Sequence, residues 1–264
     1  MNSAKSAFHA LHHADRPLLL PNAWDFASAA ALAAAGFGAV GTTSLGVAAA
    51  GGLPDAAGLA RDETVALARK LVRLPCPVTV DIEAGFSADP AQVADLVVEL
   101  ADFGVAGINL EDGRGDGLAD PATQVTLIRT VKRHAPGVFL NARTDTYWLG
   151  VDASVPATLD RARRYVDAGA DGLFVPGLAA EKDIASVTAA VPVPVNVLHL
   201  PALGLDRLAD LGVRRVSTGS LLFRSALHAT LTTALAVRDG LPLPVGIPTY
   251  AEVDALSHQG ATPG

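Results

Sequence analysis

The sequence predicts a single (β/α)8 barrel, an α/β fold in which eight parallel strands alternate with helices. The chain has 264 residues, which is typical of one such domain. Short Val/Ile-rich runs alternate with Ala/Leu-rich amphipathic segments, and this order favours a parallel sheet. One junction also recurs: an Ala-rich segment ends at a glycine, and a brief apolar run then leads into polar residues, as in "ADFGVAGINLED". Glycine suits the left-handed conformation that ends many helices.

Eight apolar runs qualify as strands, and each has its own boundary signal. The first lies in "RPLLLPNAW"; the second, fourth, sixth and eighth follow a helix-ending glycine at 36, 104, 169 and 212. The third and seventh follow the proline breaks "LPCP" and "VPVP", and the fifth follows "HAPG". The expected strands span residues 17–21, 38–43, 77–83, 106–111, 137–143, 171–176, 193–198 and 213–218.

These strands place one catalytic barrel domain over residues 1–240, because no linker or low-complexity stretch divides them. Residues 241–264 are rich in Pro and Gly, and we expect this tail to pack on a neighbouring subunit. The alternative architecture is a doubly wound open sheet. "GFGAVG" (36–41) matches the glycine spacing of a dinucleotide site, but it follows a helix and enters a strand, which is the reverse of that motif's order.

Composition excludes several classes of partner. The net charge of −7 and pI of about 5.4 argue against nucleic acid or an anionic membrane surface. No apolar run reaches the roughly 18 residues that span a bilayer, and the N-terminus lacks the apolar core of a signal peptide. A single cysteine rules out an intrachain disulfide framework. We therefore expect a cytoplasmic protein.

Acidic side chains occur in strands that are otherwise apolar. In "VTVDIEAGF" the alternation of side chains along a strand puts Asp81 and Glu83 on the face opposite Val80 and Ile82. The same alternation points Glu111, Arg143 and Asn196 into the barrel. Strands three, four and five are neighbours, so their charged side chains meet at the carboxyl-terminal mouth, where enzymes of this architecture have their active sites.

Crowded carboxylates at such a mouth repel one another and are costly to bury. A hard divalent cation relieves both problems, and Mg2+ is the natural choice because it prefers carboxylates, substrate oxygens and retained waters. The alternative is an internal ion-pair network that holds no ligand.

Six segments, taken in order from about residue 17 to 225, resemble the isocitrate lyase/phosphoenolpyruvate mutase superfamily. They read "LLLPNAWDFASA", "GTTSLGVAAAGGLPD", "VTVDIEAGF", "GINLEDG", "NARTD" and "ADGLFVPG". The resemblance implies a Mg2+-dependent barrel enzyme, with Mn2+ as an alternative, that acts on α-keto or 2-hydroxy acids through a pyruvate-like enolate. It also implies a homo-oligomer, a dimer or more typically a homotetramer, in which neighbours exchange a C-terminal helix.

The resemblance also implies roles for individual residues. Asp81 resembles the acid that touches the metal directly, whereas Asp55, Glu83 and Glu111 resemble acids that act mainly through bound waters. Arg143 and Glu111 are the expected catalytic residues, and Arg143 resembles the arginine that holds the substrate carboxylate and the enolate charge. The other expected substrate contacts are Trp24, Thr43, Ser44, Leu45, Asp81 and Asn196.

One loop departs from the pattern of the superfamily. Its carbon–carbon lyases carry a Lys-x-Cys-Gly-His motif after the fourth strand, whereas "EDGRGDGLADPATQ" contains no Lys, Cys or His. The expected function is therefore that of a lyase with an unidentified proton donor, which cleaves or decarboxylates a small α-keto or 2-hydroxy (di)carboxylic acid. Phosphonopyruvate hydrolase or phosphoenolpyruvate mutase chemistry, and a non-catalytic α-keto-acid-binding protein, are the alternatives.

Overall fold

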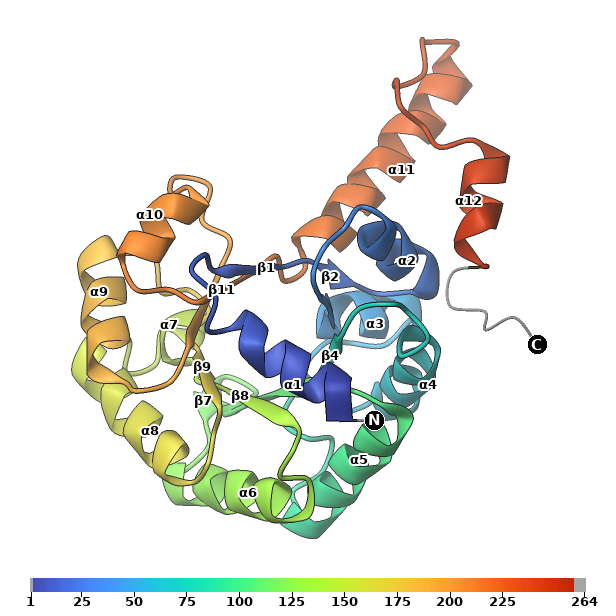
Figure 1. Ribbon diagram of the computed structural model, residues 1–264. Helices are drawn as coiled ribbons and strands as arrows, with labels where there is room; N and C mark the ends of the chain where they lie inside the picture. Colours follow the sequence, from blue (N-terminus) through green and yellow to red (C-terminus); the bar gives the residue numbers. More distant parts are fainter. Residues whose placement is uncertain (1, 259–264) are drawn as a thin grey trace.

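A ring of parallel strands surrounded by helices forms the body of the protein (Figure 1). The computed structural model describes residues 2–258. Their 9-stranded sheet has the order β1-β11-β10-β9-β8-β5-β4-β3-β2, and every pairing in it is parallel. The strands are β1 (Leu18–Leu20), β2 (Asn22–Ala23), β3 (Val40–Thr42), β4 (Val78–Asp81), β5 (Gly107–Glu111), β8 (Phe139–Arg143), β9 (Gly172–Phe174), β10 (Val195–Leu198) and β11 (Arg215–Ser217).

The two edge strands of this sheet, β1 and β2, are consecutive in the chain and are separated only by Pro21. Proline has no N–H to donate to a ladder, so the first expected strand (17–21) ends at Pro21 and the next two residues form a separate strand, β2. β1 pairs with β11 and β2 pairs with β3, and the Gly41 N–H donates to the Pro21 carbonyl (2.9 Å). The ring therefore closes through this segment, which confirms the predicted (β/α)8 barrel.

Helices cover the outside of the ring, and their boundaries follow capping chemistry. Asp89 caps α5 and Asp120 caps α6, each directly before a proline, while Ser154 caps α8. Gly104 ends α5 at φ 112°. The helices are α1 (Asn2–Leu11), α2 (Phe26–Ala34), α3 (Ser44–Ala50), α4 (Arg61–Leu71), α5 (Pro90–Phe103), α6 (Pro121–His134), α7 (Thr146–Leu149), α8 (Val155–Asp167), α9 (Glu181–Ala190), α10 (Leu205–Asp210), α11 (Leu221–Asp239) and α12 (Tyr250–Leu256).

The opposite ends of the barrel differ in chemistry. At the amino-terminal end, Phe8 of α1 is fully buried among Leu20, Ala106 and Phe139. Its ring meets that of Phe139 edge-on, with 5.6 Å between centroids. This plug leaves the carboxyl-terminal end as the open one.

The C-terminal helices leave the barrel. α11 projects outward, and α12 returns toward α2, where Leu256 packs against the main core (Figure 1). Several large apolar side chains of α11 are exposed, among them Leu227 (50%) and Leu231 (65%). No helix in residues 2–258 combines the length and apolar character needed to cross a bilayer.

Candidate active site

A pocket of about 400 Å3 opens at the carboxyl ends of the strands. Its floor carries the end of β4, β5 and β8, and its rim includes the start of α11. Charged lining residues are Asp55, Asp81, Glu111, Arg143, Asp145 and Arg224; others include Asn22, Thr43, Ser44, Leu45, Asn109, Gly113, Phe174, Leu198 and His199.

Asp81 is the last residue of β4 and faces this pocket. Its backbone N–H donates to Thr42 Oγ1 (2.8 Å), and its Oδ1 accepts the Glu83 N–H (3.0 Å). Burial raises the pKa of Asp81, and the nearby Arg143 opposes that rise. Asp81 is therefore held in place by the neighbouring β3 and by the turn that follows β4, while it still lines the pocket.

Glu83 lies beyond β4 and does not continue the strand's alternation. Its φ is 50°, in the left-handed region that few residues other than glycine adopt. Its Oε2 accepts the Gly58 N–H (3.0 Å), whereas the buried Oε1 has no partner among the described residues. Burial raises the pKa of Glu83 to about 7. Glu83 is therefore placed beside the pocket but does not line it.

Arg143, at the end of β8, holds two acids. Its Nη1 lies 2.8 Å from Glu111 Oε2, and its Nε donates to Asp145 Oδ1 (2.6 Å). Burial acts to lower the pKa of Arg143, but Glu111, Asp145 and Asp81 raise it above its ordinary value. Burial raises the pKa of Glu111 to about 8 although Arg143 opposes the shift. The single positive charge of Arg143 therefore does not neutralise the negative charge of the surrounding carboxylates.

The donor set fits a hard cation bound through few direct ligands. Within residues 2–258, no three His, Cys, Asp or Glu side chains converge closely enough to form a direct cage. Asp81 presents carboxylate oxygen to the pocket, and Glu83 Oε1 is buried without a partner. Mg2+ commonly keeps several waters and uses one or two carboxylates, so this arrangement fits Mg2+ better than an ion that demands a full protein shell.

The other predicted substrate contacts fall into two groups. Thr43, Ser44 and Leu45 line the pocket, and the first N–H groups of α3 have no partner within the helix. Trp24 and Asn196 do not line it. Trp24 packs edge-on against Phe223 (5.4 Å between centroids), and the side chain of Asn196 accepts a hydrogen bond from Ser217 Oγ inside the barrel.

Sequence reasoning missed three residues that shape this site. Phe174 lies beneath Arg143, with the guanidinium carbon 5.8 Å from its ring centroid, and its place on the inward face of β9 could have revealed it. Arg215 is buried inside the barrel and donates to Asn109 and Ser217. Arg224 reaches the pocket because α11 begins at its rim, and no local pattern announces that placement.

The loop that lacks the lyase motif is a tight hairpin. β6 (Gly113–Arg114) pairs antiparallel with β7 (Gly117–Leu118), and Asp120 then begins α6. Gly113 and Gly115 line the pocket. A β-carbon on Gly113 would lie 2.5 Å from Asp145 Oδ2, so glycine is required there for the hairpin to approach the acid cluster.

Sequence comparisons relate this chain to one family of proteins. The family model described as phosphoenolpyruvate phosphomutase matches residues 8–238. An uncharacterized protein of Mycobacterium tuberculosis is 48% identical over 249 residues, which cover 94% of this chain and 95% of that protein. A 2-methylisocitrate lyase of Salmonella typhimurium is 32% identical over 221 residues, covering 78% and 74% of the two chains.

Solved structures extend the likeness to the fold. A Burkholderia cenocepacia structure described as a phosphonomutase superposes with a TM-score of 0.82 at 38% identity, covering 89% of this chain and 99% of that one. A phosphonopyruvate hydrolase solved with oxalate and Mg2+ shares the fold at a TM-score of 0.84 and 22% identity. With its family-model match, its relatives and this barrel, the chain belongs to the phosphoenolpyruvate phosphomutase family, within the isocitrate lyase/phosphoenolpyruvate mutase superfamily.

Proposed function

We propose that the protein is a Mg2+-dependent lyase that cleaves or decarboxylates a small α-keto or 2-hydroxy dicarboxylic acid through an enolate. The observation that carries this proposal is the convergence of Asp81, Glu111 and Arg143 on one pocket at the open end of the barrel. Relatives named as 2-methylisocitrate lyases and an oxaloacetate decarboxylase support it.

Each residue has a defined task in this proposal. Asp81 would hold the metal directly, and Asp55, Glu83 and Glu111 would hold its waters. When bound, Mg2+ would supply positive charge next to the keto oxygen of the substrate. Arg143 would bind the substrate carboxylate, assisted by the N–H groups at Ser44 and Leu45. Because these charges are fixed before reaction, they stabilise negative charge as it develops.

With oxaloacetate as the substrate, the proposed reaction is a decarboxylation to pyruvate. The bond from C3 to the departing carboxylate breaks, carbon dioxide leaves, and the bonding electron pair forms the C2–C3 double bond of the pyruvate enolate. A proton delivered to C3 then gives pyruvate. The hairpin offers no Cys, Lys or His for that last step, whereas the imidazole of His199 lines the same pocket.

Arg224 supports a dicarboxylate substrate. It lies on the first turn of α11, lines the pocket and makes no ion pair with any described residue. Arg143, by contrast, is already engaged with Glu111 and Asp145. A second carboxylate at the rim would therefore find a cation that is free to bind it. Apolar Phe174 and Leu198 on the same lining suit the carbon chain between the two charged ends.

Carbon–phosphorus chemistry is the second candidate function. The family model and the phosphonopyruvate hydrolase fold relative both favour it. Three further expectations stay predictions. The chain forms a homo-oligomer through α11, the tail from residue 241 packs on a neighbouring subunit, and the protein is cytoplasmic.

The test is a direct assay with oxaloacetate, a 2-methylmalate-type acid and phosphonopyruvate, each with Mg2+ and with chelator. The proposal expects pyruvate or another short keto acid from one of the first two, only with Mg2+. Release of inorganic phosphate from phosphonopyruvate alone would replace it with the second candidate. For Arg224→Ala, KM for the dicarboxylate should rise while that for a monocarboxylate analogue stays constant; Arg238→Ala, at the far end of α11, is the matched control.

A further inference from the structure

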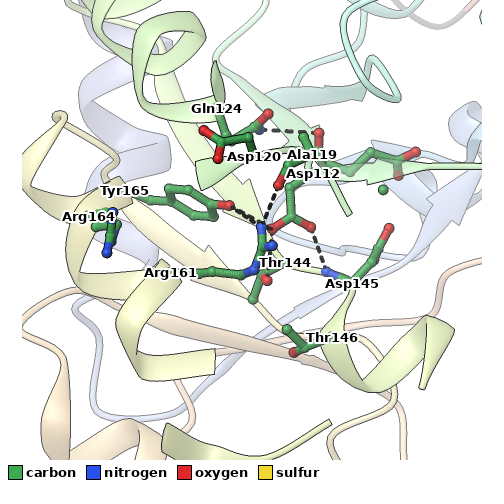
Figure 2. Close-up of polar contacts among 12 residues, drawn as sticks. Asp112, Ala119, Asp120, Gln124, Thr144, Asp145, Thr146, Arg161, Arg164 and Tyr165 are labelled. Carbon is green, nitrogen blue, oxygen red and sulfur yellow. Dashed lines mark hydrogen bonds and ion pairs between the residues drawn. The ribbon is translucent and has the colours of Figure 1, made fainter. Parts of the chain in front are cut away.

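Asp112 is a fully buried acid that directly follows β5 and lies outside the pocket lining. Its Oδ2 accepts three hydrogen bonds: from the Tyr165 hydroxyl (2.7 Å), from Arg161 Nη1 (3.0 Å) and from Thr144 Oγ1 (3.0 Å). Its Oδ1 accepts the Asp145 N–H (2.9 Å). Figure 2 shows the carboxylate at the centre of these contacts, with Tyr165 and Arg161 reaching it from α8.

Asp112 makes hydrogen bonds to Arg143 and to the two residues that follow it, Thr144 and Asp145. The Asp112 N–H donates to the Arg143 carbonyl (3.1 Å), while its carboxylate holds the Thr144 hydroxyl and the Asp145 N–H. Asp145 in turn accepts the Nε–H of Arg143. The position of the Arg143 guanidinium therefore depends on the segment 143–145, in which Asp112 hydrogen-bonds to each residue.

The same contacts fix the base of the hairpin. The Ala119 N–H donates to the Asp112 carbonyl (2.8 Å), and Arg161 Nη1 also donates to the Ala119 carbonyl (2.9 Å). The hairpin between these two residues places Gly113 and Gly115 at the pocket. Asp112 thus joins the hairpin, the arginine segment and α8 at one point.

The donors around Asp112 require a charged acceptor. Burial and the neighbouring Asp112 raise the pKa of Tyr165, so its hydroxyl stays a donor. Three donors on one oxygen and a fourth on the other leave no place for an N–H on this side chain. An asparagine would lose either the Asp145 contact or all three donors at Oδ2.

We propose that Asp112, with Tyr165 and Arg161, is a positioning centre that sets the orientation of Arg143 and the hairpin for binding of the substrate carboxylate. This inference rests on the proposed function only for the identity of what Arg143 binds. Its structural part, the control of Arg143 through Asp145, can be measured without any ligand.

The test compares Asp112→Asn with Asp171→Asn, a matched control. Asp171 is partly buried and, like Asp112, accepts hydrogen bonds from a backbone N–H and a basic side chain (Leu140 N–H and Lys132 Nζ), but it lies at the amino-terminal ends of the strands, away from the pocket. Arginine-selective 15N NMR follows the Arg143 Nε–H, identified by its loss in Arg143→Lys. The proposal expects this signal to move or broaden in Asp112→Asn and to stay unchanged in Asp171→Asn. An unchanged signal in a folded Asp112→Asn protein overturns it.

Oxalate, titrated in the presence of Mg2+, then probes the functional part. Supporting partners of this kind typically change affinity 10- to 100-fold, so we expect about 10-fold weaker oxalate binding in Asp112→Asn. Tyr165→Phe keeps the charge of Asp112 and removes one donor, so its loss should be smaller. Equal oxalate affinity in Asp112→Asn and Asp171→Asn contradicts the positioning role. If wild-type protein binds no oxalate, the proposed function fails, and the NMR comparison alone decides the inference.

Discussion

Replacement of Arg143 by methionine removes the guanidinium that pairs with the carboxylates of Glu111 and Asp145 at the pocket floor. The Arg143 side chain is 14% exposed and contacts Glu111 at 2.8 Å and Asp145 at 2.6 Å. Removing one partner of a buried ion pair costs about 3–5 kcal/mol, because the remaining charge is left uncompensated. For a domain of this size, each kcal/mol lowers Tm by about 2–4 °C, so we expect a fall of about 10 °C.

The control is Arg61→Met, which removes another arginine with two carboxylate neighbours. Arg61 lies on the surface, with 46% of its side chain exposed, beside Asp62 and Glu99. Exposed pairs contribute about 0–1 kcal/mol. Differential scanning calorimetry measures the fall in Tm of both variants. The difference between the two falls gives the effect of burying the ion pair, apart from the loss of an arginine.

The pH dependence of the Arg143→Met loss has a definite sign. Burial raises the pKa of Glu111 to about 8 from an ordinary 4.5, even with Arg143 present, and removal of Arg143 raises it further. A raised folded pKa means that the folded state keeps protons that the unfolded state releases, so stability falls as pH rises from 4.5 through about 8. Both proteins lose stability over that range, and they differ above about pH 8, where Glu111 ionises beside Arg143 but stays protonated in the variant. The penalty should therefore be larger at pH 9 than at pH 5. A loss no greater than that of Arg61→Met, or equal at both pH values, would refute the reasoning.

Three other substitutions test separate parts of the structure. Gly113→Ala would place a methyl group 2.5 Å from Asp145 Oδ2 and should abolish oxalate binding with little change in Tm; normal affinity in calorimetry would show that the hairpin can shift freely. Leu231→Asp puts a charge on the exposed apolar side of α11, so light scattering should show smaller particles, and an unchanged mass would exclude this surface from the proposed oligomer. Phe8→Ala empties the barrel plug and should cost about 3–5 kcal/mol in urea unfolding, whereas a loss below 1 kcal/mol would mean that α1 is not part of the core.

The barrel could be predicted because its information is local. Each strand is a short apolar run, and the residue that ends the preceding helix or begins the strand is a glycine or a proline. All eight expected strands are present, although each is shorter than its expected range. The break between β1 and β2 also has a local cause, since Pro21 has no N–H to donate to either neighbouring strand.

The acid cluster could be predicted in part, for a reason that is also local. Alternation along β4, β5 and β8 correctly sends Asp81, Glu111 and Arg143 to one end of the barrel. It fails for Glu83, because β4 ends at Asp81 and the chain then adopts a left-handed turn. Strand periodicity says nothing about a residue once the strand has ended.

Contacts between segments that are far apart in the chain could not be predicted from the sequence. Asp112 is bonded to Arg161 and Tyr165, 49 and 53 residues further along the chain. Arg224 enters the pocket only because α11 begins at the rim. Neither placement follows from periodicity or capping, since both depend on how the outer helices pack against the ring.

The most direct test of the magnesium-dependent keto-acid site is isothermal titration of oxalate into the protein with Mg2+ and with chelator, for wild type and for Asp81→Asn. Asp81→Asn keeps the size of the side chain and its backbone contacts, so it removes chiefly the charge that faces the pocket. The account predicts binding to wild type only with Mg2+, and none to the variant. Equal oxalate binding without Mg2+, or full binding by Asp81→Asn, would contradict it.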